Sequence, residues 1–218
     1  DRGEGEDSLT GGADANALVG GMADDRLQGG TGRDIFVINK GDGRDVVVAE
    51  GAVVDTLSIG GDLRLRDLKF RQRGRDLELS LGGNDSITLE GWYDGHQSIQ
   101  SLQIIMGATQ GFASGQGESW EDNQVEVFDF AALVAEYDNE RRGSSGWALT
   151  NALNQFHLAG SDTEALGGDI SYHYGMDGSL SGIGVQPARD ALSDGNFGNQ
   201  LQAFHTLDSI QTGDLRIG

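Results

Sequence analysis

Hydrophobic and polar positions follow three different patterns along the chain. In the first 37 residues one apolar residue recurs every nine positions, and these residues are Leu9, Leu18, Leu27 and Phe36. Between residues 63 and 106 apolar and polar residues alternate, which predicts half-buried β-strands. Beyond residue 125 the apolar spacing becomes three to four, which predicts helices. These changes divide the chain into residues 1–62, a strand-rich segment 63–106, a Gly/Ser/Gln-rich linker 107–124 and a helical region 125–218.

The nine-residue spacing belongs to a repeat. Its blocks are RGEGEDSLT, GGADANALV, GGMADDRLQ and GGTGRDIFV, without a gap between them. The sixth position of each block holds Asp7, Asn16, Asp25 or Asp34. A period of nine fits no helix, whereas two blocks give eighteen residues, one coil of a short-sided solenoid. Glycine-rich turns expose carbonyl oxygens, and an aspartate adds a carboxylate, which is the all-oxygen environment that calcium prefers. A flexible Gly-rich linker would not keep this register.

These blocks resemble the GGxGxDxUx repeat of the RTX, or haemolysin-type calcium-binding, family. The resemblance implies a parallel β-roll in which each calcium ion lies between turns eighteen residues apart. For a first site it implies side chains and carbonyl oxygens from Asp7, Asp25, Gly3, Gly5, Gly20 and Met22. For a second site it implies ligands from Asn16, Asp34, Gly12, Asp14, Gly29 and Thr31.

The sequence also departs from the repeat. Asp14 and Ala23 stand at the fourth position, where the family has glycine. Ala23 and Gly21 belong to the turn before Asp25, and both are kept among the candidate metal-site residues. Because Asn16 replaces an aspartate and removes a negative charge, we expect the second site to be the weaker one.

Two looser segments follow the regular blocks, KGDGRDVVV and EGAVVDTLS. Asp45 could complete a third site with Asp25, and Asp55 a fourth with Asp34. Alternatively, both are ordinary turn aspartates that precede buried strands. The sequence therefore predicts two to four calcium ions.

Residues 63–106 resemble the haemolysin-type calcium-binding-related segment that follows RTX rolls. Leu68 and Phe70 precede a turn at residues 73–75, and alternating apolar residues follow it up to Leu89. We expect these strands to cap the open end of the solenoid, because an unpaired sheet edge invites aggregation.

The same segment carries six of the fifteen basic residues within twelve positions: Arg64, Arg66, Lys69, Arg71, Arg73 and Arg75. We call these six residues the basic strip. One interpretation is a docking patch for an anionic glycan, lipopolysaccharide or phospholipid. The other is a solvated outer face that guards an edge strand and offsets nearby acids.

The last region predicts helices at 127–141, around Leu149 to Phe156, from 162 to 174, at 188–192 after Pro187, and at 199–207. It resembles the helical tails of large RTX exoproteins. The final residues DLRIG are similar to the uncleaved C-terminal signals of type I secretion. The expected fold class is therefore β then α: a short parallel β-roll capped by β-strands, followed by a mostly helical C-terminal region.

Composition narrows the function classes. The chain has 218 residues, a formal net charge of -20, 36 glycines and no cysteine. Such an acidic chain is not expected to bind nucleic acid, whose phosphates repel it. Neither an N-terminal signal peptide nor an apolar run long enough to span a membrane is expected. No HExxH or GxSxG motif occurs and the four histidines are scattered, so no enzyme activity is expected.

Together these patterns suggest a calcium-triggered folding module at the C-terminus of a secreted RTX toxin, adhesin or exoenzyme of a Gram-negative type. The expected partners are calcium ions and the type I secretion machinery, which would export the chain without a cleaved N-terminal signal. The rival hypothesis is a module that binds a cell-surface glycan or membrane through the basic strip.

Overall fold

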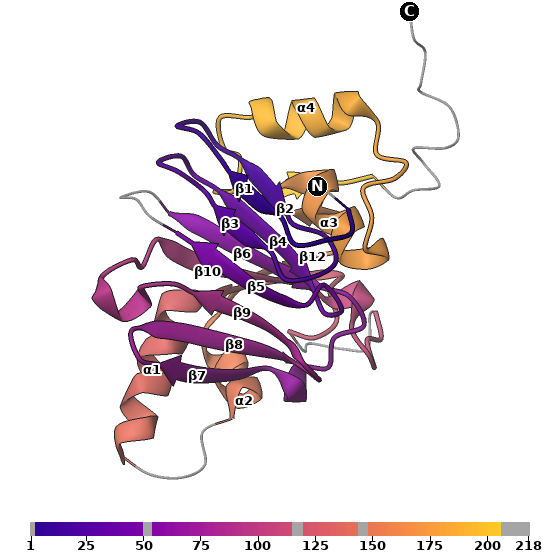
Figure 1. Ribbon diagram of the computed structural model, residues 1–218. Helices are drawn as coiled ribbons and strands as arrows, with labels where there is room; N and C mark the ends of the chain where they lie inside the picture. Colours follow the sequence, from indigo (N-terminus) through magenta and orange to yellow (C-terminus); the bar gives the residue numbers. More distant parts are fainter. Residues whose placement is uncertain (1–2, 50–53, 115–119, 144–147, 206–218) are drawn as a thin grey trace, which may run out of the picture.

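The computed structural model describes residues 3–49, 54–114, 120–143 and 148–205. Two six-stranded sheets face each other, and α-helices cover parts of both (Figure 1). The first sheet has the order β1 (Ser8–Thr10), β3 (Arg26–Gln28), β5 (Arg44–Val48), β9 (Asp85–Leu89), β8 (Asp76–Gly82) and β7 (Lys69–Arg73). The second has the order β12 (His157–Ser161), β11 (Val125–Asp129), β10 (Ile99–Ile105), β6 (Asp55–Gly60), β4 (Ile35–Asn39) and β2 (Ala17–Val19).

The two sheets are built alike. In the first sheet β1, β3, β5 and β9 are parallel, and β9, β8 and β7 continue as an antiparallel meander. In the second sheet β2, β4, β6 and β10 are parallel, and β10, β11 and β12 are antiparallel. Strands β9 and β10 thus occupy the edges that β5 and β6 would otherwise leave unpaired.

Successive strands from β1 to β6 alternate between the sheets, so the chain coils. Paired residues in the regular blocks are eighteen apart, as Leu9 with Leu27 and Leu18 with Phe36 show. Each of the first three blocks supplies one three-residue strand, and the fourth supplies the start of the five-residue β4. The central side chains become more deeply buried along the chain, from a half-buried Leu9 to fully buried Leu27 and Phe36.

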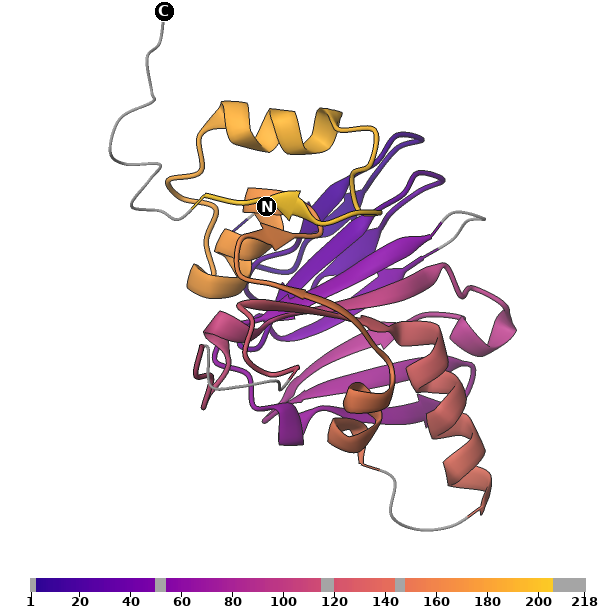
Figure 2. The same cartoon turned by 180° about the vertical axis from the view of Figure 1, so that it is seen from behind.

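Four α-helices lie in the described part of the second half: α1 (Phe130–Gly143), α2 (Leu149–Gln155), α3 (Gly168–Asp177) and α4 (Val185–Ser193). Short 3-10 turns occur at η1 (Leu65–Asp67), η2 (Trp92–Asp94) and η3 (Met106–Ala108), and β13 (Glu164–Ala165) pairs with β14 (Gln202–Ala203). Viewed from behind, α3 and α4 lie at the end that holds β1 and β2, and α1 and α2 at the opposite end (Figure 2). Among the described residues, no helix has both the length and the apolar character needed to cross a membrane.

The main core fills the space between the sheets, and α1 and α2 extend it with Phe130, Leu133 and Leu153. A second apolar cluster lies where Ile35 and Val37 of β4 meet α3. Strand β4 is therefore buried on both faces, which explains its continuous apolar sequence IFVI.

The predicted fold class is wrong. The structure is a mixed α/β fold with two six-stranded, mostly parallel sheets, not a short β-roll followed by a mostly helical region. Residues after 125 supply two strands of the second sheet. The helix predicted from residue 127 begins only at Phe130, because Val125 to Asp129 pair with the edge of β10. An unpaired edge of buried strands is costly, and pairing overrides the helical spacing.

Of the other predicted strands and helices, some are confirmed and some are wrong. Strands β7, β8 and β9 confirm the predicted alternation, and α2 and α4 confirm two predicted helices. The helix predicted over 162–174 is wrong at its start, because Gly167 takes a left-handed φ of 82° and α3 begins after it. In place of the helix predicted at 199–207, the described residues form the short strand β14. Residues 206–207 of that prediction and the whole DLRIG ending lie outside the described residues.

Candidate calcium sites

The predicted side-chain ligands form two ladders, one on each side of the coil. The first ladder is Asp7, Asp25 and Asp45, and the second ladder is Asn16, Asp34 and Asp55. Residues of the first ladder lie just before or at the start of β1, β3 and β5, and residues of the second ladder do the same for β2, β4 and β6. The parallel register brings residues from successive coils into contact, so both ladders follow directly from the repeat.

The same hydrogen bond forms each rung of both ladders. The backbone N–H of one ladder residue donates to Oδ1 of the aspartate in the next coil. The distances are 2.7 Å from Asp7 to Asp25, 3.0 Å from Asp25 to Asp45, 2.9 Å from Asn16 to Asp34 and 2.9 Å from Asp34 to Asp55. In each of these four aspartates one carboxylate oxygen, Oδ1, therefore accepts a hydrogen bond from the backbone.

The second carboxylate oxygen has no such partner in three of these aspartates. Oδ2 of Asp25, Asp34 and Asp45 is buried and accepts no hydrogen bond from the described residues. The three residues are 2%, 0% and 2% exposed. In Asp55, by contrast, Oδ2 accepts a hydrogen bond of 2.5 Å from the Ser98 hydroxyl. A buried carboxylate oxygen without a partner is strongly unfavourable, and a bound cation would satisfy it.

Backbone turns of adjacent coils meet beside Asp25. The Met22 N–H donates to the Gly3 carbonyl at 2.9 Å, and the Gly5 N–H donates to the Met22 carbonyl at 3.0 Å. A side chain at Gly20 would overlap the free Oδ2 of Asp25, since its Cβ would lie only 2.2 Å away. The structure thus brings together Asp7 and Asp25 with the turns that hold the predicted carbonyl ligands.

The second predicted site has the same backbone arrangement. The Thr31 N–H donates to the Gly12 carbonyl at 3.2 Å, and a Cβ at Gly29 would lie 2.4 Å from Oδ2 of Asp34. The difference lies in Asn16, whose side-chain amide donates to Oδ1 of Asp34 at 3.0 Å and also to the Asp14 carbonyl. An amide nitrogen therefore occupies the place where a carboxylate oxygen would face an ion.

Two residues of the turn before Asp25 adopt positive φ angles. Gly21 has φ 105°, where glycine carries no steric cost, and a Cβ there would overlap the Gly3 carbonyl. Ala23 has φ 92°, which is unfavourable for a residue with a Cβ. The departure from glycine at this position therefore places strain in the ligand-forming turn.

Burial raises the pKa of Asp25, Asp34, Asp45 and Asp55. It raises the pKa of Asp45 to about 7, with further contributions from the negative charges of Asp42, Asp25 and Asp24. It raises the pKa of Asp55 to about 6, and it raises the pKa of Asp25 and Asp34 as well. Hydrogen bonds to the backbone oppose these shifts without cancelling them. Such carboxylates are poorly stabilised as anions, and a divalent cation would reverse the effect.

Asp42 is a buried acid that the repeat analysis did not select. It is 6% exposed, accepts hydrogen bonds from the Asn39 N–H at 2.7 Å and the Tyr174 hydroxyl at 3.1 Å, and burial raises its pKa to about 6. Its charge also contributes to the raised pKa of Asp45. The sequence feature that could have identified Asp42 is its position between Gly41 and Gly43 in the looser block, which is typical of a turn.

Within the described ranges, no three or more His, Asp or Glu side chains lie together so that they could hold a metal ion by themselves. The predicted sites contain at most two carboxylates each and depend on backbone carbonyl oxygens for the rest. The residues present fit a hard cation with oxygen ligands, because the free carboxylate oxygens lie beside tight carbonyl-bearing turns.

The chain matches no protein-family model, and no curated protein is significantly similar to it.

Proposed function

We propose that this chain binds calcium along the two ladders and that calcium binding drives its folding. One observation carries the proposal: Asp25, Asp34 and Asp45 each bury a carboxylate oxygen that has no partner among the described residues. A fold that repeats the same unsatisfied oxygen three times, each time between adjacent coils, is explained by a cation that completes it.

The residues of each site differ in what they offer. Asp7 and Asp25, with the carbonyls of the turns at Gly3 and Met22, would hold the strongest ion, because both residues carry a carboxylate and the Asp7 charge acts on Asp25. Asp25 and Asp45 would hold another, since both have a free Oδ2. Asn16 and Asp34 would hold a weaker one, since only one carboxylate is present. Asp55 is the poorest candidate because the Ser98 hydroxyl already occupies its Oδ2.

Folding without the ion would be difficult. Strands β1, β2 and β3 have three residues each, and among these nine residues only Leu18, Val19 and Leu27 are buried apolar side chains. Ordering each residue costs about 1–2 kcal/mol of backbone entropy, and stacked aspartates add like-charge repulsion. Binding that occurs only in the folded state contributes directly to folding stability.

This coupling suits a secreted protein. Extracellular calcium modules bind at about 10⁻⁴–10⁻³ M, so such a chain would stay unfolded in the calcium-poor cytosol and fold outside the cell. An unfolded chain passes a narrow export channel, whereas a folded one does not. The assignment to type I secretion rests on the resemblance of the repeat.

The decisive experiment compares Asp25→Asn with Asp24→Asn. Asp25 belongs to two rungs of the first ladder, whereas its half-buried neighbour Asp24 belongs to none and pairs with Arg44 at 2.7 Å. Calcium titrations followed by circular dichroism should show a wild type that loses much of its structure in chelator and regains it as calcium is added. Asp25→Asn should raise the calcium midpoint by at least about tenfold, since a ligand charge is lost from two sites.

Asp24→Asn should leave that midpoint within about twofold of the wild type, because surface ion pairs are worth little. Isothermal titration calorimetry counts the ions independently and should find fewer in Asp25→Asn. Identical spectra in chelator and in millimolar calcium, together with no heat of binding, would refute the proposal.

A further inference from the structure

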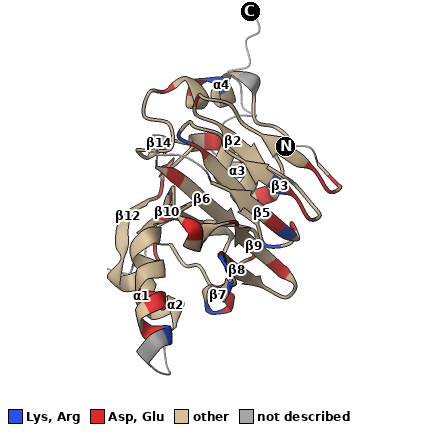
Figure 3. Cartoon of the chain, turned by 60° about the vertical axis from the view of Figure 1, so that its left-hand side comes forward, with Lys and Arg blue, Asp and Glu red and all other residues tan. Residues whose placement is uncertain are grey.

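The basic strip lies on and beside the edge strand β7. Lys69, Arg71 and Arg73 are exposed on one face of β7, while Phe70 between them is buried. Arg64 and Arg66 lie in and before the turn η1 that leads into the strand. Figure 3 shows basic segments gathered at β7 and the adjacent hairpin, on a molecule whose acidic segments dominate elsewhere.

Three adjoining hollows follow this edge and share basic residues. The first, about 460 Å³, is lined by Arg64, Arg66 and Thr150 among others. The second, about 510 Å³, lies between β7, α1 and α2 and is lined by Arg66, Lys69 and Tyr137. The third, about 620 Å³, contains Lys69 again, with Arg71, Arg73, Ser80 and Ser86, and also the acidic residues Asp67, Glu78 and Asp85. Since Arg66 and Lys69 each line two neighbouring hollows, the three form one track, which we call the basic track.

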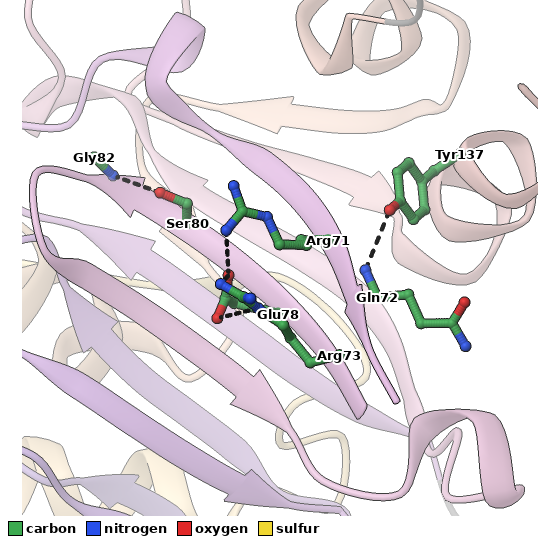
Figure 4. A network of polar contacts seen from close by, with 7 residues as sticks. All are labelled: Arg71, Gln72, Arg73, Glu78, Ser80, Gly82 and Tyr137. Carbon is green, nitrogen blue, oxygen red and sulfur yellow. Dashed lines mark hydrogen bonds and ion pairs between the residues drawn. The ribbon is translucent and has the colours of Figure 1, made fainter. Parts of the chain in front are cut away.

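The basic residues of the strip differ in whether they form an ion pair with an acidic side chain. Arg71 and Arg73 converge on Glu78, at 3.8 and 3.2 Å (Figure 4), and Arg75 pairs with Asp94 at 3.6 Å. Within the described part of the chain, Arg66 and Lys69 have no acidic partner within 4.0 Å, and the Arg64 side chain bonds only to the amide of Gln110. Arg66 and Lys69, which form no ion pair in this part of the chain, are therefore the residues that lie where the hollows adjoin.

Tyr137 forms a fixed part of the wall of the track. Tyr137 reaches from α1 to the edge of the sheet, where its hydroxyl accepts a hydrogen bond from the Gln72 N–H at 3.2 Å (Figure 4). Its ring is thereby fixed beside Phe70, with centroids 5.7 Å apart. The hydroxyls of Ser80, Ser86 and Thr150 supply donors and acceptors along the way.

We propose that the basic track binds a linear anionic polysaccharide that carries carboxylate or sulfate groups. Spaced cations suit a polymer with regularly repeated charges, and hydroxyls with a fixed aromatic ring suit sugar units. A membrane surface is disfavoured, because the exposed large apolar side chains of the described residues, which are Met22, Val54, Leu158 and Leu192, do not line the track. Single-stranded nucleic acid is disfavoured because it binds by stacking its bases on a series of aromatic rings, and the described residues that line the track include only two such rings, Tyr137 and the buried Phe70.

The test uses the full chain in saturating calcium, so that any requirement of calcium for folding does not enter. Dextran sulfate and hyaluronate are the anionic probes, and neutral dextran is the matched uncharged polymer. The double variant Arg66→Gln, Lys69→Gln lowers the net charge by two. The control Arg189→Glu lowers it by the same amount on α4, away from the track.

The wild type should bind the anionic polymers and not dextran, with an affinity that falls as salt rises. The double variant should bind roughly fivefold more weakly, as expected for two surface charges, and Arg189→Glu should bind as the wild type does. Unchanged circular dichroism would show that both variants fold. Equal losses in the double variant and the control, or no binding of either anionic polymer, would overturn the proposal. So would tighter binding to anionic phospholipid vesicles or to single-stranded DNA.

Discussion

Asn16 has two opposite effects on its ladder. Its amide donates to Oδ1 of Asp34 and to the Asp14 carbonyl, so it satisfies acceptors in the absence of an ion. The same amide offers a calcium ion no charge. A single side chain therefore stabilises the second ladder without calcium and weakens the ladder as a calcium site.

The substitution Asn16→Asp separates these effects. In calcium-depleted buffer it should destabilise the protein by about 1–3 kcal/mol, because a donor is lost and a second carboxylate faces Asp34. In millimolar calcium it should bind more tightly than the wild type, since the site gains a carboxylate. Thermal melts in both buffers measure whether the variant is less stable than the wild type without calcium and more stable with it. A change in the same direction in both buffers would contradict this role.

Ala23 is the second residue at which the repeat deviates. Its φ of 92° lies in a region that suits glycine, so Ala23→Gly should raise the free energy of unfolding in calcium by about 1 kcal/mol. Asp14→Gly is the matched control, since Asp14 occupies the same block position without a positive φ. Chemical denaturation of both variants measures the difference, and an equal gain in both would rule out strain as the cause.

At the scale of the elements, the ladders predict an unusual pH dependence. Burial raises the pKa of Asp45 to about 7 and those of Asp42 and Asp55 to about 6, from an ordinary 3.8. Between pH 4 and 7 the folded state thus holds protons that the unfolded state has released. Without calcium, the stability of the fold should be greatest near pH 4 and fall as the pH rises to about 7.

Calcium should invert this trend, because protons compete with the ion for the carboxylates. Circular dichroism at pH 4.5, 6 and 8 measures the folded fraction in calcium-depleted and calcium-saturated buffer. The folded fraction should fall with rising pH in the first buffer and rise with it in the second. A calcium-free protein that gains stability between pH 4.5 and 8 would show that these aspartates are not buried as the structure has them.

The elements that the sequence predicted well are those set by local pattern. The period of nine placed Leu9, Leu18 and Leu27 at the centres of β1, β2 and β3 and Phe36 in β4, and the period of two placed Leu77 and Leu79 in β8. Strand β11 was missed because its partner β10 lies twenty or more residues upstream, and pairing with that edge decided its structure. The ladder residues were found from the repeat, but the unpartnered Oδ2 atoms depend on the coil geometry, and no sequence pattern contains them.

At the scale of the molecule, the second sheet joins the coil to the C-terminal half. Phe130 of α1 is buried, with its ring 5.6 Å from Phe70 and 5.3 Å from Trp92. Phe130→Ala should cost about 3–5 kcal/mol. If folding and calcium binding are coupled across the sheets, this remote change should also raise the calcium midpoint.

Leu158→Ala is the control, because Leu158 is 59% exposed on β12. Calcium titrations followed by tryptophan fluorescence and by circular dichroism should give one midpoint for both probes in each variant. Separate midpoints, or an unchanged midpoint in Phe130→Ala, would show that the ladders fold independently of the helices.

The alternation of β1 to β6 between two sheets also has a mechanical consequence. A force applied to the N-terminus acts first on β1, which is held by three paired residues and by the Asp7–Asp25 rung. The coils should therefore detach one after another rather than all at once. Each eighteen-residue coil would lengthen the chain by roughly 60 Å, so single-molecule stretching in calcium should record steps of about that size, which merge when calcium is removed.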